Sequence, residues 1–175
     1  MLTARMSRAY TTIERVLIRP ATGHDHDAIW TIFEPVIRAG ETYTRPRDAS
    51  REDALAYWFA PGRDVFVAED AGTILGTYSL RANQTGGGSH VANCSYLVAA
   101  HAGGRGVGRA LCEDSLRRAK ANGFRGMQFN FVVSTNERAV HLWQSCGFEI
   151  VGRVPGAFAH PALGYVDALI MYRAL

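Results

Sequence analysis

The stretch YLVAAHAGGRGVGRAL at residues 96–111 decides the fold. It begins with an apolar segment and continues with four glycines within six positions: Gly103, Gly104, Gly106 and Gly108. From Val107 onward apolar side chains recur at helical spacing, which predicts an amphipathic helix directly after the glycines. In such a turn the main-chain N–H groups converge on one point, where the positive end of the helix dipole adds to them. The stretch therefore predicts a strand, a phosphate-binding turn and a helix.

Two arginines support this prediction, and the residues after the turn limit its ligand. Arg105 and Arg109 would add charge-assisted contacts to a pyrophosphate. A Walker loop needs Lys followed by Ser or Thr after its last glycine, but here Arg109 and Ala110 follow Gly108. The turn is therefore not typical of a nucleoside triphosphatase.

A dinucleotide-binding domain is not expected either. A fingerprint that starts at Gly106 has Leu111 where its third glycine should stand. Residues 124–131 contain no acidic residue that would hold a ribose. The other alternative is a glycine turn that only packs the helix against a sheet, and a glycine cluster alone does not exclude it.

The pattern of apolar residues around the turn predicts a mixed α/β domain. We expect strands at residues 13–18, 65–68, 73–80, 91–98, 127–133, 148–154 and 166–172, and helices at residues 28–37, 50–59, 107–121 and 134–147. Ser134 with Glu137 three positions later predicts a capping box at the start of the last helix. We expect residues 1–10 to be a flexible segment and residues 11–175 to form one domain.

Length and composition fit one globular domain. The chain has 175 residues, of which 47% are hydrophobic and 20% charged, far from the composition of a disordered protein. The formal net charge is only +3, so no nucleic acid partner is expected. No apolar run approaches the roughly 18 residues that cross a bilayer, and residues 1–12 lack the apolar region of a signal peptide. We therefore expect no membrane association and a cytoplasmic location.

Cysteines and histidines indicate neither a disulfide framework nor a metal site. Cys94, Cys112 and Cys146 are widely spaced and include no CxxC pair, so we expect buried, reduced thiols. His24 and His26 stand at the start of a predicted helix, where capping and exposure to solvent explain them better than metal binding. No metal is expected.

The glycine turn resembles the acetyl-coenzyme A loop of the GCN5-related N-acetyltransferases, the GNAT family. Gly106 and Gly108 match the last two positions of the family pattern Arg or Gln, x, x, Gly, x, Gly or Ala, whereas Gly103 departs from the first. Five later residues fit the family's following helix and strand: Asn136, Ala139, Leu142, Gly147 and Phe148. Together the matching motifs cover residues 90–155 of the chain.

This resemblance implies a GNAT acyl-CoA N-acyltransferase fold, with a central, mostly antiparallel sheet whose middle strands splay apart between flanking helices. It implies acetyl-CoA as the cosubstrate, with the thioester in the gap between the strands at 96–98 and 127–133. The residues that it assigns to cofactor binding are Leu97, Val98, Gly103, Gly104, Arg105, Gly106, Val107, Gly108, Arg109 and Asn136. Asn136 also fits a structural role as a helix cap. A main-chain N–H at Leu97 or Val98 would stabilise the developing oxyanion.

The residues that carry protons in many family members are absent. The usual glutamate and tyrosine correspond here to Asn93 and Trp143. An amide does not titrate and an indole N–H only donates a hydrogen bond, so neither replaces the missing acid or base. Because an alkyl amine has a pKa of about 10.4, only about one molecule in a few thousand is free base at pH 7. A base or a water chain is therefore needed to remove the proton of the amine. Trp143 also fits a purely structural role as an aromatic residue of the core.

Candidate catalytic residues follow from position and chemistry. Asn93 and Asn130 lie on two strands that line the proposed gap, and a buried amide in so apolar a strand must find hydrogen-bond partners. They would orient a substrate or polarise a nucleophile through water; bonding to neighbouring backbone is the alternative. Glu41, in the connection between the first two helices, would bind an ammonium group or act as base, unless it is only a solvated carboxylate. His160 and Asp167 are weaker candidates.

Short segments resemble two narrower groups of acetyltransferases. Residues 129–132, with residues 166–170, are similar to the fungal enzymes that act on proline analogues such as azetidine-2-carboxylate. Glu41 and Thr42 are similar to the phosphinothricin type. The first resemblance implies a small secondary-amine amino acid as the acceptor.

Other functions stay open at this point. The aromatic residues Tyr43, Tyr57, Trp58 and Phe59 favour a small closed pocket over the open groove that a protein amine would need. An alternative from another class is a sensor that binds acyl-CoA without turnover, because the usual Glu and Tyr are missing. The sequence does not decide the oligomeric state, and a homodimer is compatible with it.

Overall fold

Seven strands form one sheet in the computed structural model, which describes residues 16–175. Their order across the sheet is β1-β2-β3-β4-β5-β7-β6. Neighbouring strands run antiparallel except for β4 and β5, which are parallel. The strands span Leu17–Pro20 (β1), Asp64–Asp70 (β2), Thr73–Ala82 (β3), Val91–Val98 (β4), Gly126–Val133 (β5), Glu149–His160 (β6) and Gly164–Ala174 (β7). This mixed, mostly antiparallel sheet confirms the predicted fold class.

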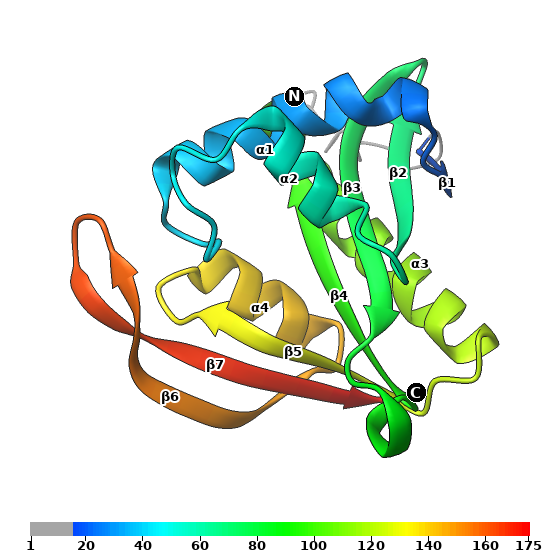
Figure 1. The fold of residues 1–175 in the computed structure, drawn as a ribbon. Helices are drawn as coiled ribbons and strands as arrows, with labels where there is room; N and C mark the ends of the chain where they lie inside the picture. The colour runs from blue at the N-terminus through cyan, green and yellow to red at the C-terminus, as the bar shows by residue number, and fades with distance from the viewer. Residues whose placement is uncertain (1–15) are drawn as a thin grey trace, which may run out of the picture.

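Helices cover both faces of the sheet (Figure 1). They span His26–Ala39 (α1), Arg51–Trp58 (α2), Val107–Ala121 (α3) and Glu137–Ser145 (α4). Thr77 and Tyr78 are neighbours on β3, so their side chains point to opposite faces. The indole of Trp58 in α2 donates to Thr77 Oγ1 at 3.2 Å, whereas the Tyr78 hydroxyl donates to Asp114 in α3 at 2.7 Å. The Phe33 ring of α1 lies 5.2 Å from the Trp58 ring, so α1 and α2 share one face and α3 packs on the other.

The parallel strands β4 and β5 separate after a short stretch of pairing. Val91 pairs with Gly126 and Ala92 pairs with Met127, and the ladder ends there. Beyond this point β4, in green, and β5, in yellow, diverge (Figure 1). The splayed middle strands that the family resemblance implies are therefore present.

The first strand differs from the sequence prediction in its bounds. It begins at Leu17 and includes Pro20, two residues beyond the predicted end at residue 18. Because β1 is an edge strand, the missing N–H of proline breaks no ladder bond on its outer side. The expected start at residue 13 and the flexible segment 1–10 lie outside the described residues.

The last helix begins later than predicted, and the predicted capping box is wrong. The Ser134 N–H donates to the Asp167 carbonyl at 2.9 Å, which keeps Ser134 bonded to β7. The helix begins at Glu137, and Asn136 caps it because its side-chain oxygen accepts from the Ala139 N–H at 3.3 Å. The cap therefore comes from the same asparagine that the resemblance assigns to the cofactor.

Candidate functional site

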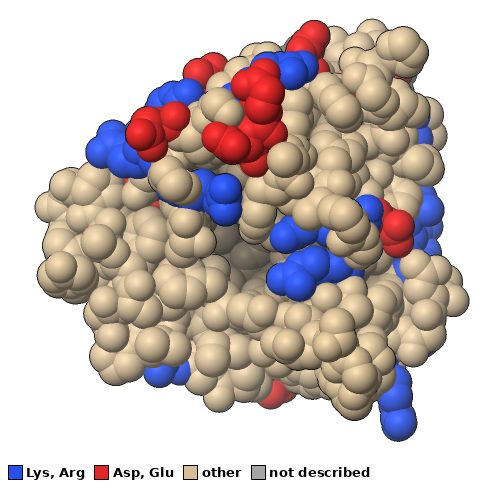
Figure 2. Space-filling model, in the orientation of Figure 1, with Lys and Arg blue, Asp and Glu red and all other residues tan. Residues whose placement is uncertain are grey.

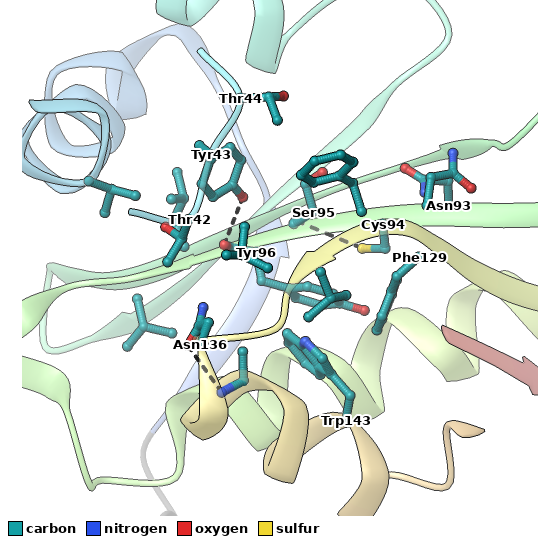
Figure 3. Close-up of a pocket in the computed structure, with 18 of the residues that line it drawn as sticks. Thr42, Tyr43, Thr44, Asn93, Cys94, Ser95, Tyr96, Phe129, Asn136 and Trp143 are labelled. Atoms are coloured by element: carbon teal, nitrogen blue, oxygen red, sulfur yellow. Dashed lines mark hydrogen bonds between the residues drawn. The ribbon is translucent and has the colours of Figure 1, made fainter. Parts of the chain in front are cut away.

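A cavity of about 330 Å³ lies where β4 and β5 separate. Its lining residues are Val36, residues 42–44, Tyr57, Arg81, residues 93–98, residues 129–133, Asn136, Ala139 and Trp143. Figure 2 shows a hollow on this face of the molecule, and Figure 3 shows the side chains that surround the cavity. None of these described lining residues is Asp, Glu or His.

The main chain of β4 offers hydrogen-bonding groups to this cavity. The Ala99 N–H bonds to β3 at 2.9 Å, so alternate residues back along β4, including Leu97, direct their N–H and C=O groups toward β3. The corresponding groups of Tyr96 and Val98 therefore face the gap, where β5 does not pair with them. The Tyr43 hydroxyl donates to the Tyr96 carbonyl at 2.9 Å, which agrees with this direction. Of the two expected oxyanion donors, Val98 faces the gap and Leu97 does not.

The glycine turn presents main-chain donors beside the gap. Gly104 and Gly106 have φ values of 77° and 79°, in the left-handed region that favours glycine. No described residue accepts a hydrogen bond from the N–H groups of Gly104, Gly106, Val107, Gly108 or Arg109. These groups lie at the start of α3, where the helix dipole favours an anion. The turn therefore leaves a set of donors for an anionic ligand.

Gly108 and Gly103 have different roles within this turn. A Cβ at Gly108 would lie 3.0 Å from Leu142 in α4 and 3.7 Å from Val98, so the start of α3 packs directly against β4 and α4. The Gly103 N–H bonds to the Ala100 carbonyl at 3.2 Å. Gly103, which departs from the family pattern, therefore contributes no free main-chain donor.

Both arginines of the turn are paired within the protein. Arg105 lies 2.8 Å from Asp70, and Arg109 donates to Ser145 at 2.8 Å and pairs with Glu113 at 3.6 Å. Such partly exposed pairs contribute little to stability. The guanidinium groups can therefore exchange these partners for a pyrophosphate at a small cost.

Asn136 and Trp143 form the α4 side of the cavity (Figure 3). Asn136 acts as the cap of α4, and its side-chain NH₂ donates to none of the described residues. Trp143 is 8% exposed, with its ring 4.7 Å from the Tyr96 ring and 5.1 Å from the Phe129 ring. Trp143 is therefore a core aromatic that also forms a wall of the cavity.

Asn93 stands where the β4–β5 ladder ends. Its Nδ2 donates to the Gln128 carbonyl in β5 at 2.8 Å, and the residue is 8% exposed. The side chain thus takes the place of the ladder bond that is lost as the strands separate. Its Oδ1 accepts no hydrogen bond from the described residues, and Asn93 borders the cavity. The expected bonding to neighbouring backbone is present, and one acceptor remains for a ligand.

Asn130 is exposed, so the expectation that it is buried is wrong. The β5–β7 register shifts between Phe129 and Val132, and this irregularity turns Asn130 toward the surface. Its Nδ2 donates to Asn83 at 2.7 Å, and its Oδ1 accepts from Gln128 at 2.8 Å. Asn130 still borders the cavity, but its amide needs no ligand to be satisfied.

The remaining candidates do not line the cavity. Glu41 is exposed in the turn after α1, whereas the next residues, Thr42, Tyr43 and Thr44, line the cavity. His160 and Asp167 belong to the β6–β7 hairpin, where Asp167 pairs with Arg153 at 2.7 Å. The structure therefore does not bring Glu41 together with Asn93 and Asn130.

The thiol and two phenols inside the cavity are held in their neutral forms. Burial raises the pKa of the Cys94 thiol to about 12. Burial also raises the pKa of the Tyr43 and Tyr96 phenols well above the usual value. At neutral pH none of these three groups is a base or an anionic nucleophile.

A group of arginines beside the cavity was missed by sequence reasoning. Arg81, at the end of β3, lines the cavity, and burial followed by repulsion from Arg63 lowers the pKa of its guanidinium. The guanidinium carbons of Arg45 and Arg63 lie 4.7 and 4.5 Å from the centre of the Tyr57 ring. Arg81 lies just beyond the strand predicted at residues 73–80, so the sequence pattern did not place its side chain. Arg45 and Arg63 lie in loops, where no periodic pattern of apolar residues predicts the direction of a side chain.

The described residues contain neither a membrane-spanning helix nor a cluster of metal ligands. Within residues 16–175 no helix is long and apolar enough to span a bilayer. No group of three or more potential metal ligands occurs there. The three cysteines are free and buried.

Comparisons with known proteins agree with this geometry. The model of the acetyltransferase (GNAT) family matches residues 27–148. The chain is 46% identical to a GCN5-related N-acetyltransferase from Kribbella flavida, with a TM-score of 0.89 over 94% of this chain and 100% of that one. It is 29% identical to N-acetyltransferase aca1 of Schizosaccharomyces pombe over 153 residues, 77% of this chain and 72% of that protein. A phosphinothricin acetyltransferase from Sinorhizobium meliloti, solved in complex with acetyl-CoA, shares the fold at 22% identity, with a TM-score of 0.81 over 92% of this chain and 89% of that one.

Proposed function

The chain belongs to the GNAT family of acetyltransferases and is an acetyl-CoA-dependent N-acetyltransferase, and from this premise we propose that its acceptor is a small-molecule amine of the amino-acid class. The observation that carries the proposal is the position of the cavity. It lies between the unpaired edge of β4 and the unpaired stretch of β5, beside the free N–H groups at the start of α3. The free N–H groups beside one end of the cavity suit a diphosphate, and aromatic side chains line the other end.

On the donor side, main-chain groups supply the proposed contacts. The N–H groups of Gly104 and of residues 106–109 would bind the pyrophosphate, because they have no protein partner and the helix dipole favours an anion there. The gap-facing groups of Tyr96 and Val98 would bind the pantetheine arm in the manner of an added strand. The Val98 N–H is the proposed donor to the oxyanion, because its direction is fixed by the β3–β4 ladder.

Transfer by direct attack fits the chemistry of the lining. The neutral amine attacks the thioester carbonyl, the carbon–sulfur bond breaks, and the proton lost by the amine balances the proton gained by the thiolate. A covalent acetyl-enzyme would need a thiolate, but burial holds the pKa of Cys94 at about 12. Both substrates therefore have to be bound together, with the acceptor amine placed against the carbonyl carbon.

The acceptor side favours a small molecule over a protein amine. Thr42, Tyr43 and Thr44 cover the cavity from the α1–α2 connection, and Tyr57 closes it from α2. A volume of about 330 Å³ has room for an amino acid beside the acetyl group, and is at the lower end of ligand pockets. Proline-like amino acids are the first candidates because of the segment around Asn130, and phosphinothricin-type acids are the second.

A coenzyme A thiol assay with a panel of acceptors tests this proposal. The protein is mixed with acetyl-CoA and, separately, with L-proline, azetidine-2-carboxylate, phosphinothricin, a simple alkyl amine and an unmodified peptide. We expect thiol release above the acceptor-free rate with at least one amino acid and none with the peptide. Release with the peptide alone would show that the small-molecule acceptor is wrong. No release with any amine, despite calorimetric binding of acetyl-CoA, would point to a sensor.

A further inference from the structure

We propose that Arg45, Arg63 and Arg81 form a carboxylate-binding site that selects acceptors with an acid group next to the amine. The proposal rests on the acetyltransferase function above and narrows the chemical class of its acceptor. Three separate parts of the chain bring these arginines together: the α1–α2 connection, the α2–β2 connection and the end of β3. Figure 2 shows Lys and Arg atoms on two sides of the hollow.

The three side chains gather around one aromatic ring. The guanidinium carbon of Arg45 lies 4.7 Å from the centre of the Tyr57 ring, and that of Arg63 lies 4.5 Å from it. Tyr57 and Arg81 both line the cavity, and Arg63 is close enough to Arg81 for their charges to repel. Cation–π contacts of this kind hold a guanidinium in place without neutralising its charge. The ring therefore positions positive charge at the acceptor end of the cavity.

This positive charge has no counter-ion in the part of the chain that the structure describes. Arg45, Arg63 and Arg81 form no ion pair there, whereas Arg19 and Arg105, for example, each lie 2.8 Å from an aspartate oxygen. The Nε atoms of Arg45 and Arg81 are buried and find no hydrogen-bond acceptor. Partly buried like charges without partners are unfavourable unless a ligand supplies the opposite charge. The arrangement therefore fits an anion-binding site.

The position of Arg81 separates this site from the one for pyrophosphate. Arg81 pairs with Asn93 in the β3–β4 ladder, whereas Gly76 pairs with Val98 beside the glycine turn. Arg81 is five positions after Gly76, a separation of about 17 Å along the strand. Arg81 therefore lies at the end of the cavity away from the free N–H groups of α3, and we assign this end to the acceptor.

The chemistry of a guanidinium group points to a carboxylate. Its planar fork forms two parallel hydrogen bonds with the oxygens of a carboxylate. In an α-amino acid one carbon separates the carboxylate from the amine, so binding at Arg81 holds the amine close by. The free Oδ1 of Asn93, the ladder partner of Arg81, can accept from that amine and orient it toward the gap.

The same charges help to prepare the amine for attack. No described lining residue is Asp, Glu or His, and the Tyr43 and Tyr96 phenols and the Cys94 thiol are held neutral. The charged residue that lines the cavity is therefore Arg81, and Arg45 and Arg63 lie beside it around the Tyr57 ring. The three arginines carry three positive charges, and the carboxylate of a bound amino acid neutralises one of them. The remaining positive charge favours loss of the proton from the ammonium group of that amino acid. The arginines would thus lower the pKa of a bound amino acid's amine without acting as a base.

Matched acceptor pairs combined with an arginine variant test the proposal. We would compare L-proline with pyrrolidine, and azetidine-2-carboxylate with azetidine, for wild type and Arg81→Gln, by thiol release. Arg125→Gln is the control, because Arg125 is exposed and does not line the cavity. Because a hydrogen bond to a charged group is worth a factor of about 10 to 100, we expect Arg81→Gln to lower kcat/KM for the amino acid at least about tenfold.

The pattern across the pairs decides the result. Removal of the acceptor's carboxylate should lower wild-type kcat/KM by about 100-fold, and it should reduce the effect of Arg81→Gln to a small factor. In Arg81→Gln, the KM for acetyl-CoA should equal that of wild type. The pH at which turnover of the amino acid reaches half of its maximum should be higher in Arg81→Gln than in wild type. An equal loss with both members of a pair, or equal wild-type rates for acid and amine, would overturn the carboxylate site. Arg63→Gln repeats the test if Arg81→Gln does not fold.

A binding measurement separates this inference from the transferase proposal. If no amine releases thiol, the same amino acids are titrated by calorimetry into the protein saturated with coenzyme A. Binding that is lost in Arg81→Gln and kept in Arg125→Gln would support the carboxylate site while the proposed transfer fails. No binding to the wild-type protein would overturn both.

Discussion

Replacement of Gly106 by valine tests whether the glycine turn holds the cofactor through its main chain. Gly106 stands at the start of α3 with φ of 79°, and Gly123 stands just after the end of the same helix with φ of 83°. A Cβ at Gly123 would meet nothing within 4 Å. Gly123→Val therefore carries a matched backbone strain without touching the cavity, and it is the control.

The size of each effect follows from the geometry. A left-handed conformation costs a residue with a Cβ about 1–2 kcal/mol. In a protein of this size that lowers the Tm of either variant by about 2–8 °C. Partial rotation of the turn to accommodate the valine would redirect the N–H groups of Gly106 and Val107. Loss of two hydrogen bonds to a charged phosphate, at about 1.5–3 kcal/mol each, raises the KM for acetyl-CoA by about 100-fold or more.

Three measurements separate strain from binding. Steady-state thiol release yields the KM for acetyl-CoA, calorimetry yields the Kd for coenzyme A, and thermal melting yields the Tm. We expect both variants to lose similar Tm, and Gly106→Val alone to lose cofactor affinity. A Gly106→Val protein with wild-type cofactor constants and a lowered Tm would refute the reasoning, because its turn would then matter only for folding.

Three other outcomes are expected on the same physical grounds. Cys94→Ala should keep turnover within about threefold, because a thiol with a pKa of about 12 is no nucleophile at pH 7; loss of turnover together with a trapped acetyl group on the wild-type thiol would contradict direct attack. For an acceptor without a carboxylate, log kcat/KM should rise with unit slope up to the amine's own pKa, and a plateau near pH 7 would reveal a base outside the described lining. Hydrogen bonds from Arg19 hold the pKa of the Asp25 carboxyl far below its usual range. The stabilisation by Asp25 is therefore present above pH of about 4 and declines as the pH falls below it; urea unfolding of wild type and Asp25→Asn should converge toward pH 2, and a constant difference would argue against this ion pair.

The donor side of the site was predictable because its signal is local in the sequence. Glycines, a helical repeat and two arginines within residues 96–111 specify a turn whose N–H groups are free, and the turn has this form. The direction of each main-chain group was not predictable. Leu97 and Val98 look equivalent in the sequence, but the register with β3 decides that only Val98 faces the gap. Register is a property of two strands, so one strand's sequence does not contain it.

The acceptor side depends on contacts between distant segments, and sequence reasoning placed its residues less well. Glu41 was a candidate because it follows the first helix, but its side chain is exposed to solvent. The next residue, Thr42, lines the cavity instead. Asn130 was expected to be buried because its neighbours are apolar, but an irregularity in β5 brings it to the surface. Arg45 and Arg63 come from loops, and only the packing of Tyr57 brings them together.

Asn93 lies where the sheet opens, at a position where a carboxylate could not make the same hydrogen bond. At this position the side chain donates to the Gln128 carbonyl, at the point where the strands begin to separate. A carboxylate there would have no proton to donate and would face that carbonyl oxygen with a negative charge, so it could not make the same contact. An amide at position 93 therefore stabilises the open gap but cannot accept the acceptor's proton. The amine must then be made neutral by its surroundings, and the positive charge next to Asn93, on Arg81 and its neighbours, acts in that direction.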